Sequence, residues 1–478
     1  MRAHACSTAV GAAALLAACV AGPNYARPEV QLPPAWKLEA PWQAGVPDDA
    51  APRGPWWQRF HDVRLDTLQE QALANSPSLE IAEARLEQAR AIVRATSAQR
   101  LPNASVGARA ARQRISANRP LSAYSSSNFE TVQNDLAPSL TVAYEFDLAG
   151  RIQRSIEGAQ ASAEQSAADL ETARLLLATD LATAYFNVRA TDIELDVLAR
   201  SIALQRRSLD FVSTRHDLGV ASGLDVAQQQ ALLDTTLTQV DLLRRQRSQF
   251  EHAIAALAGT PAPSFALGPD IAELEPPTVP LGVPSDVLQR RPDVASAERA
   301  MAVANAQIGV ASAAYYPSIT IAPSGGFESR ALASLFDAPS LVWSIGATIT
   351  QPLFSGGRLG ANVDFARANY DATVASYRRT VLVAMQEVED GITGLASLER
   401  AGTQARTAVD TARRVLDLAT ARYEGGATTY LDVITAQQSL LAAERLAAQV
   451  GGQRLLISVF LIKALGGDWQ APVAVARH

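Results

Sequence analysis

Cysteine is almost absent from this chain of 478 residues, which contains two. Both, Cys6 and Cys19, lie at the extreme N-terminus, so the rest of the chain has neither a disulfide nor a cysteine metal site. Its five histidines are scattered, and no P-loop, H-E-x-x-H or G-x-S-x-G motif is present. We therefore expect no enzyme activity, no cofactor and no metal site. The net charge of −6 also argues against a nucleic-acid partner.

The N-terminus has the pattern of a processed leader. Arg2 precedes an apolar run from Ala9 to Ala18 that is too short to span a membrane and is typical of a signal peptide. It ends in a Leu-Ala-Ala-Cys sequence that resembles a bacterial lipobox, so we expect residues 1–18 to be removed and Cys19 to be the lipid attachment site. By resemblance to enterobacterial lipoproteins, Val20 after this cysteine favours the outer membrane. An ordinary signal peptide with an incidental cysteine is the alternative.

A Pro- and Trp-rich arm follows the leader over residues 19–64. Its composition predicts an extended segment that packs along a larger surface. The tryptophans of this arm could belong to a ligand site, but packing against the body of the protein explains them better.

One stretch, residues 358–424, organises the chain. No proline interrupts it, and its apolar residues recur at alternating steps of three and four, from Val374 through Tyr377, Val381 and Ala384 to Val388. This heptad-like stripe predicts one long coiled-coil helix. At ~1.5 Å per residue the helix would span ~100 Å, which no ordinary globular domain needs.

The same pattern occurs earlier, over residues 151–217, at a constant shift that also relates the glycine-bearing turns after both helices. We interpret this as an internal duplication. The first repeat covers residues 65–260 as helix, strand pair, long helix, tip turn and helix. A Pro-rich linker over 261–284 leads to the second repeat, 285–467, and a short tail over 468–478. The shorter helices are expected at 65–100, 224–257, 285–315 and 431–465.

Each repeat also contains two strand-like segments, of which the second in each repeat alternates clearly between apolar and polar residues while 104–112 alternates poorly. They are expected at 104–112, 140–146, 318–322 and 343–350. Such segments suit the wall of an outer-membrane barrel. Four strands cannot close a barrel, and open sheet edges are not tolerated in lipid, whereas three chains would supply twelve strands. The predicted fold is therefore mainly α with membrane β, in an oligomer.

Three groups of motifs, held in one order within the duplicated frame, carry a family resemblance. They are Gly22-Pro23-Asn24-Tyr25 after Cys19, the central Arg291-Pro292-Asp293 with Ala297-Glu298 and Tyr316-Pro317-Ser318, and the two tip turns. With these motifs the mature chain resembles the outer-membrane efflux lipoproteins of the TolC-like, NodT type.

The resemblance implies a homotrimer with a 12-stranded outer-membrane β-barrel continued by a long periplasmic α-helical barrel. It further implies a periplasmic adaptor protein and an inner-membrane resistance-nodulation-division pump as partners, with the chain as the passive exit duct of a tripartite efflux system. The alternative is a structural periplasmic coiled-coil lipoprotein that does not conduct, with its strands packed as a soluble sheet.

The working parts are expected at the two tip turns, which carry glycines at the ends of the long helices. The residues expected to contact the adaptor are Leu218, Gly219, Val220, Ala221, Ser222, Gly425, Gly426, Ala427 and Thr428. The resemblance implies a gate in which Tyr423 hydrogen-bonds Asp225, and an aperture carboxylate ring from Asp432 with an apolar ring from Leu431. An N-cap role is the alternative for Asp432. The chain departs from better-known members at Thr435 and Thr428, where they carry an aperture carboxylate and an assisting arginine.

Overall fold

The computed structural model describes residues 20–28, 55–115, 131–272, 275–277 and 290–467. The chain divides into two compact units, each considered by itself. The strand unit comprises residues 1–28, 86–166 and 297–377 and holds all the described strands. The helical unit comprises residues 29–85, 167–296 and 378–478.

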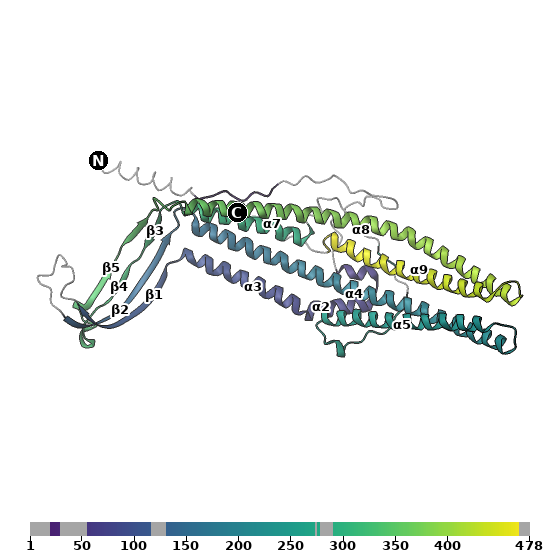
Figure 1. The fold of residues 1–478 in the computed structure, drawn as a ribbon. Coiled ribbons are helices and arrows are strands. Elements are labelled where there is room, and N and C mark those ends of the chain that lie inside the picture. The colour runs from purple at the N-terminus through teal and green to yellow at the C-terminus, as the bar shows by residue number, and fades with distance from the viewer. Residues whose placement is uncertain (1–19, 29–54, 116–130, 273–274, 278–289, 468–478) are drawn as a thin grey trace. The chain divides into compact units, whose positions relative to one another are not determined.

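The strand unit contains one antiparallel sheet (Figure 1). Strand β1 (Asn103–Ile115) pairs with β2 (Thr131–Phe146) in a continuous register from Asn103 opposite Ala143 to Ile115 opposite Thr131. Both strands are longer than the alternation in the sequence predicted. Strand β2 gains its extra residues at its N-terminal end, where Pro138 lies within the ladder opposite Ala108.

The strands of the second repeat are each divided into two. Strands β3 (Ser318–Ile321) and β4 (Ser324–Phe327) pair in succession with β2, and β6 (Ala347–Thr350) and β5 (Leu341–Ser344) pair with them in turn. The break between β3 and β4 lies at Pro323, which has no N–H to donate, yet its carbonyl still accepts from Val142 N at 2.9 Å. The six segments therefore form four strand lines, as predicted.

Large apolar side chains on this sheet are exposed. Val106 is 83 % exposed, Trp343 72 % and Ile349 67 %. Single exposed apolar residues are ordinary, but a sheet with several of them needs an apolar surrounding.

Two helical hairpins give the chain its repeat. Helices α4 (Arg151–Asp217) and α8 (Arg358–Glu424) are 67 residues each, with the bounds that the sequence predicted. Their return helices, α5 (Gly223–Leu257) and α9 (Tyr430–Ala464), are 35 residues each. Figure 1 shows each return helix running back along its long helix. The equal lengths in both halves support the internal duplication.

The first helix of each repeat differs from the prediction. Instead of one helix over 65–100, α2 (Val63–Asn75) and α3 (Pro77–Ser97) are separated by Ser76, whose ψ of 118° is extended. The residue before a proline is pushed out of the helical region, which explains the break. In the second repeat, α7 runs from Pro292 to Ala313, so Pro292 occupies the first helical position.

The core of the helical unit begins at a short 3-10 helix, η1 (Trp56–Phe60). Trp56, Trp57 and Phe60 are buried in the same cluster as Tyr185 and Phe186 of α4. These two tryptophans therefore pack against the body, as predicted, while the other arm tryptophans lie outside the described residues. The remaining 3-10 turns are η2 (Ala98–Arg100), η3 (Ala262–Ser264), η4 (Leu332–Ser334) and η5 (Ala338–Ser340).

Candidate channel gate and tip turns

The first tip turn joins α4 to α5. Gly219 has φ +80°, and the next residue, Val220, donates its N–H to Arg215 O at 2.9 Å, which closes the end of α4. The return helix opens with a capping box: Ser222 Oγ accepts from Leu224 N at 3.1 Å, and Asp225 Oδ2 accepts from Ser222 N at 3.1 Å.

The second tip turn repeats this geometry between α8 and α9. Gly426 has φ +72°, and Ala427 N donates to Arg422 O at 2.8 Å. A side chain at either glycine would be strained by its positive φ, although nothing lies within 4 Å of a Cβ placed there. Both predicted turns therefore exist as glycine-bearing ends of long helices.

The two turns differ in what they expose. In the first, Leu218 is 73 % exposed and Val220 62 %. The second has only small residues from Gly425 to Thr428, followed by Leu431, which is 53 % exposed. The first turn therefore offers apolar side chains to a partner, and the second offers mainly backbone.

The hydrogen bond expected between Tyr423 and Asp225 is absent from the described structure. Asp225 is engaged in the capping box of α5. Tyr423 is buried, but its hydroxyl makes no hydrogen bond among the described residues, and its ring packs instead against Tyr430, with the ring centroids 5.0 Å apart. A carboxylate three residues into a helix has a ready partner in the helix's own N-terminus, which explains why Asp225 does not reach the other hairpin.

The aperture residues lie at the start of α9. Leu431 and Asp432 are both exposed. Asp432 lies at the third position of the helix, after the N-cap Thr429, and accepts a hydrogen bond from Thr428 Oγ1. The N-cap position considered for Asp432 therefore belongs to Thr429. Thr435 Oγ1 donates to Leu431 O at 2.8 Å, within its own helix.

A polar layer that the sequence analysis missed joins the two hairpins. Tyr430 on α9 donates its hydroxyl to Gln229 Oε1 on α5 at 3.0 Å. Gln437 Nε2 on α9 donates to Ser208 Oγ on α4 at 2.8 Å, and Gln229 Nε2 donates to Gln205 O on α4 at 3.1 Å. Gln205 and Gln229 are 0 % exposed, Tyr430 2 % and Gln437 3 %. Burial raises the pKa of Tyr430 to about 12.

A signal for this layer was present in the sequence. Gln229 lies in the same buried stripe of α5 as Leu232, Leu233 and Val240. A polar residue inside an apolar coiled-coil stripe often fixes which helices pair and in what register.

Ring contacts reinforce the same region. The Arg215 guanidinium on α4 lies 5.1 Å from the ring centroid of Tyr423 and 5.7 Å from that of Phe211. A cation this close to an aromatic ring is held by cation–π attraction. Tyr423 therefore contributes to the link between the hairpins through its ring.

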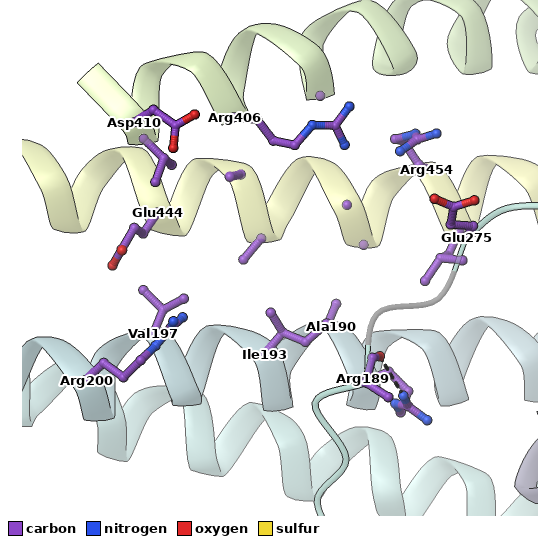
Figure 2. Close-up of a pocket in the computed structure, with 18 of the residues that line it drawn as sticks. Arg189, Ala190, Ile193, Val197, Arg200, Glu275, Arg406, Asp410, Glu444 and Arg454 are labelled. Carbon is purple, nitrogen blue, oxygen red and sulfur yellow. Dashed lines mark hydrogen bonds between the residues drawn. The ribbon is translucent and has the colours of Figure 1, made fainter. Parts of the chain in front are cut away.

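The helical unit also contains a cavity of ≈ 410 Å³ bordered by α4, α8 and α9 (Figure 2). Part of its charged lining is paired: Arg413 contacts Glu444 at 2.9 Å, and Arg189 contacts Asp62 at 3.1 Å. The described residues include no group of three or more His, Cys, Asp or Glu side chains able to hold a metal. The cavity thus has the character of a charged groove between helices.

The predicted lipid attachment site, Cys19, lies outside the described residues, but the segment after it is firmly held. Ala21 N donates to Ala149 O at 2.9 Å, and Arg154 Nε donates to Ala21 O at 3.1 Å. A Cβ on Gly22 would lie 2.5 Å from Gly309 Cα, so only glycine fits there. The chain is therefore fixed in the strand unit within a few residues of Cys19.

Comparison with known proteins identifies the family. A sequence model described as "Outer membrane efflux protein" matches residues 68–260 and 283–467. The chain belongs to the outer membrane efflux protein family. It is 32 % identical over 476 residues to the toluene efflux pump outer membrane protein TtgF of Pseudomonas putida, covering 98 % of both chains. It is 31 % identical to the pyoverdine export outer membrane protein OpmQ of Pseudomonas aeruginosa, covering 97 % of this chain and 96 % of the relative.

The fold comparison agrees. The structure of the outer-membrane channel OprN matches with a TM-score of 0.86 at 28 % identity, covering 95 % of this chain and 100 % of that one. The fold class predicted from the sequence, long helices continuing a membrane-type sheet, is therefore confirmed as that of outer-membrane efflux channels. The family consists of channel and efflux duct proteins, which favours an exit duct over the non-conducting structural lipoprotein.

Proposed function

We propose that the chain is the exit duct of a tripartite efflux system and conducts substrates passively across the periplasm and outer membrane. The duct function follows from the family and the channel fold. The observation that carries it in this chain is the sheet of four strand lines with exposed apolar residues, joined covalently to helices of 67 residues. At ~1.5 Å per residue such helices are ~100 Å long, far more than the thickness of a bilayer.

Three copies complete the duct in this proposal. Among the described residues the sheet ends at β1 on one side and at β5 and β6 on the other, which leaves two edges for pairing with neighbouring chains. In lipid every backbone N–H and C=O group must be paired, which requires the edges of neighbouring chains to join. Three chains with four strand lines each close a 12-stranded barrel, a size that leaves a lumen.

A periplasmic adaptor and an inner-membrane resistance-nodulation-division pump are the proposed partners. TtgF and its relatives are named as outer membrane components of efflux pumps, which supports a partner in the inner membrane. The tip turns are the proposed adaptor contacts, with Leu218 and Val220 as apolar anchors and Gly425 and Gly426 allowing close approach of backbone. The named cargoes of relatives at similar identity, toluene and pyoverdine, differ in chemistry. We therefore propose that the partners select the cargo.

The proposed gate lies at the beginning of α9, next to the second tip turn. Leu431 and Asp432 are exposed at the beginning of α9, and three copies of Asp432 around an axis would form a carboxylate ring. Such a ring would favour cations over anions. Asp225 and Tyr423 support this region through a helix cap and a ring contact.

Acyl chains on Cys19 are proposed to anchor the mature chain to the outer membrane. The clamp on residues 21 and 22 supports this, because it would hold the lipid beside the junction of β2 and α4. Mass spectrometry of the N-terminal peptide would detect the acyl chains, and an unmodified peptide cleaved elsewhere would contradict the anchor.

The proposed function is tested by deleting the gene in its host and restoring it. We expect the deletion strain to lose resistance to compounds exported by the pump that is encoded beside this gene, and to recover it when the gene is restored. Unchanged resistance and unchanged cargo accumulation in the deletion strain, with the pump expressed, would contradict the duct.

A further inference from the structure

One face of the sheet is apolar. Residues that lie opposite each other in a strand ladder share a face, as do alternate residues along one strand. Val106 lies opposite Leu140 of β2. Through Gly325 of β4 the same face reaches Trp343 of β5, and along β2 it continues to Phe146. The large side chains of this face are exposed, so it suits the lipid-facing wall of a membrane barrel.

The opposite face is polar. Ser105 lies opposite Thr141, and Thr141 lies opposite Ser324 of β4. Arg109 is on this face and forms an ion pair with Asp135 at 2.5 Å. In the proposed barrel this face would line the water-filled lumen.

The apolar face becomes charged at one end of β1. Arg112 and Arg114 are separated from Val106 by even numbers of residues, and the ladder to β2 has no bulge, so both arginines lie on its face. Among the described strand residues of this face, these two carry its only charges, and none is acidic. Arg112 is exposed and pairs with no carboxylate of the described chain. Because β1 begins just after α3 and η2, its arginines lie at the end of the sheet away from the helices.

The ladder gives the height of Arg112 above the helical end of the sheet. Arg112 lies opposite Asn134, and at the other end the apolar face stops at Phe146, directly before Asp147. From Phe146 to Asn134, β2 covers ~40 Å at ~3.4 Å per residue. With the ~40° tilt of strands in membrane barrels, this length corresponds to a height of ~30 Å, more than the apolar band of ~25 Å. Arg112 therefore lies beyond the hydrocarbon, at the level of the lipid headgroups.

We propose that Arg112, with Arg114 next to it on the same face, binds the phosphate groups of anionic lipids in the outer leaflet. A guanidinium matches phosphate oxygens with two parallel hydrogen bonds. An arginine on the lipid-facing side is costly near the middle of a bilayer and costs little at its border, which is where this face carries its charges. The inference rests on the proposed function, because the sheet must close into an outer-membrane barrel whose helices point into the periplasm.

Native mass spectrometry of the purified full-length oligomer in detergent measures the lipid that stays bound. The probes are lipid A, which carries phosphates, and the same lipid with its phosphates removed. The wild type should retain lipid A in preference to the lipid without phosphates. Arg112→Gln should lower the apparent affinity for lipid A by about fivefold, the effect of one arginine near an anionic lipid surface. Arg112→Lys should keep most of the affinity, because it keeps the charge.

Arg109→Gln is the matched control. It removes the same charge from the same strand but from the polar face, so its binding of lipid A should equal that of the wild type. Native electrophoresis checks that each variant still forms the oligomer. Equal binding of lipid A by the wild type and Arg112→Gln, or an equal loss in Arg109→Gln, would overturn the inference, as would equal retention of the lipid without phosphates.

Planar-bilayer recordings of the same preparations separate this inference from the proposed function. An oligomer that conducts but shows no preference for the phosphorylated lipid contradicts the lipid site alone. An oligomer that prefers the phosphorylated lipid through Arg112 but never conducts contradicts the duct alone.

Discussion

Substitutions of Tyr423 distinguish a hydrogen-bonded contact from a packed one. Tyr423 is 8 % exposed, and its ring lies 5.0 Å from the Tyr430 ring and 6.4 Å from the Phe211 ring, measured between centroids. The Arg215 guanidinium lies 5.1 Å above it. Because the hydroxyl makes no hydrogen bond among the described residues, Tyr423→Phe removes almost nothing and should change the free energy of unfolding by less than ~0.5 kcal/mol.

Tyr423→Ala removes the whole ring. A buried aromatic residue replaced by alanine typically costs ~3–5 kcal/mol. Of this, each lost ring pair accounts for ~0.5–1.5 kcal/mol and the cation–π contact for ~0.5–1 kcal/mol. Tyr423→Leu, which keeps apolar bulk but loses the ring contacts, should fall between the two.

Hydrogen exchange of the amides at the start of α9 measures this locally, because loosening near the tip need not unfold the whole oligomer. Protection should follow the order wild type, Tyr423→Phe, Tyr423→Leu, Tyr423→Ala, with the first two nearly equal. If Tyr423→Phe loses as much protection as Tyr423→Ala, the hydroxyl makes the important contact and the ring-packing account is wrong.

Three further predictions concern other parts of the helical unit. Arg291→Ala should lower the free energy of unfolding by ~1–3 kcal/mol in denaturant titrations. Buried Arg291 contacts Glu387 at 2.6 Å and donates to Ala464 O at 3.1 Å, and Lys463, 3.5 Å from Glu387, would remain as a partner of that carboxylate. An unchanged free energy of unfolding would contradict this prediction. Burial raises the pKa of Tyr430 from 10.0 to about 12, so its neutral form contributes stability that is complete below pH 10 and lost as the pH rises to about 12. Tyr430→Phe should reduce this loss of stability at alkaline pH. The reduction should be partial, because the pKa of buried Tyr185 is raised as well. Identical dependence of the free energy of unfolding on pH in Tyr430→Phe and the wild type would contradict the role given to Tyr430. Gly219→Trp and Gly426→Trp should each abolish efflux while the oligomer still forms in native electrophoresis, and normal resistance in both would argue against docking at the tips.

Much of the helical architecture could be predicted from the sequence because its signals are local. The bounds of α4 and α8 follow from Gly150-Arg151 and Gly357-Arg358 at one end and the tip glycines at the other. The break between α2 and α3 at Ser76 could have been predicted from the proline that follows it. It was missed because the apolar periodicity continues on both sides of the break. Strand β2 was predicted too short because a proline, here Pro138, is unusual inside a strand and suggested that the strand begins after it.

The contacts between hairpins were harder to predict. A heptad stripe specifies that a helix has partners, but not which residue of the other hairpin lies opposite. The family resemblance implied that Asp225 and Tyr423 meet, whereas Asp225 caps its own helix. The contacts are made instead by Tyr430, the first residue of α9, and by Gln437, about two turns further along the same helix.

Single-channel recording of the purified full-length oligomer in a planar bilayer tests the central claim most directly. We expect discrete ion-conducting events of uniform size, with a cation preference that weakens in Asp432→Ala. Membrane-inserted oligomers that carry no current, in the wild type and equally in Gln437→Met and Tyr423→Ala, would contradict the account of this chain as a gated duct.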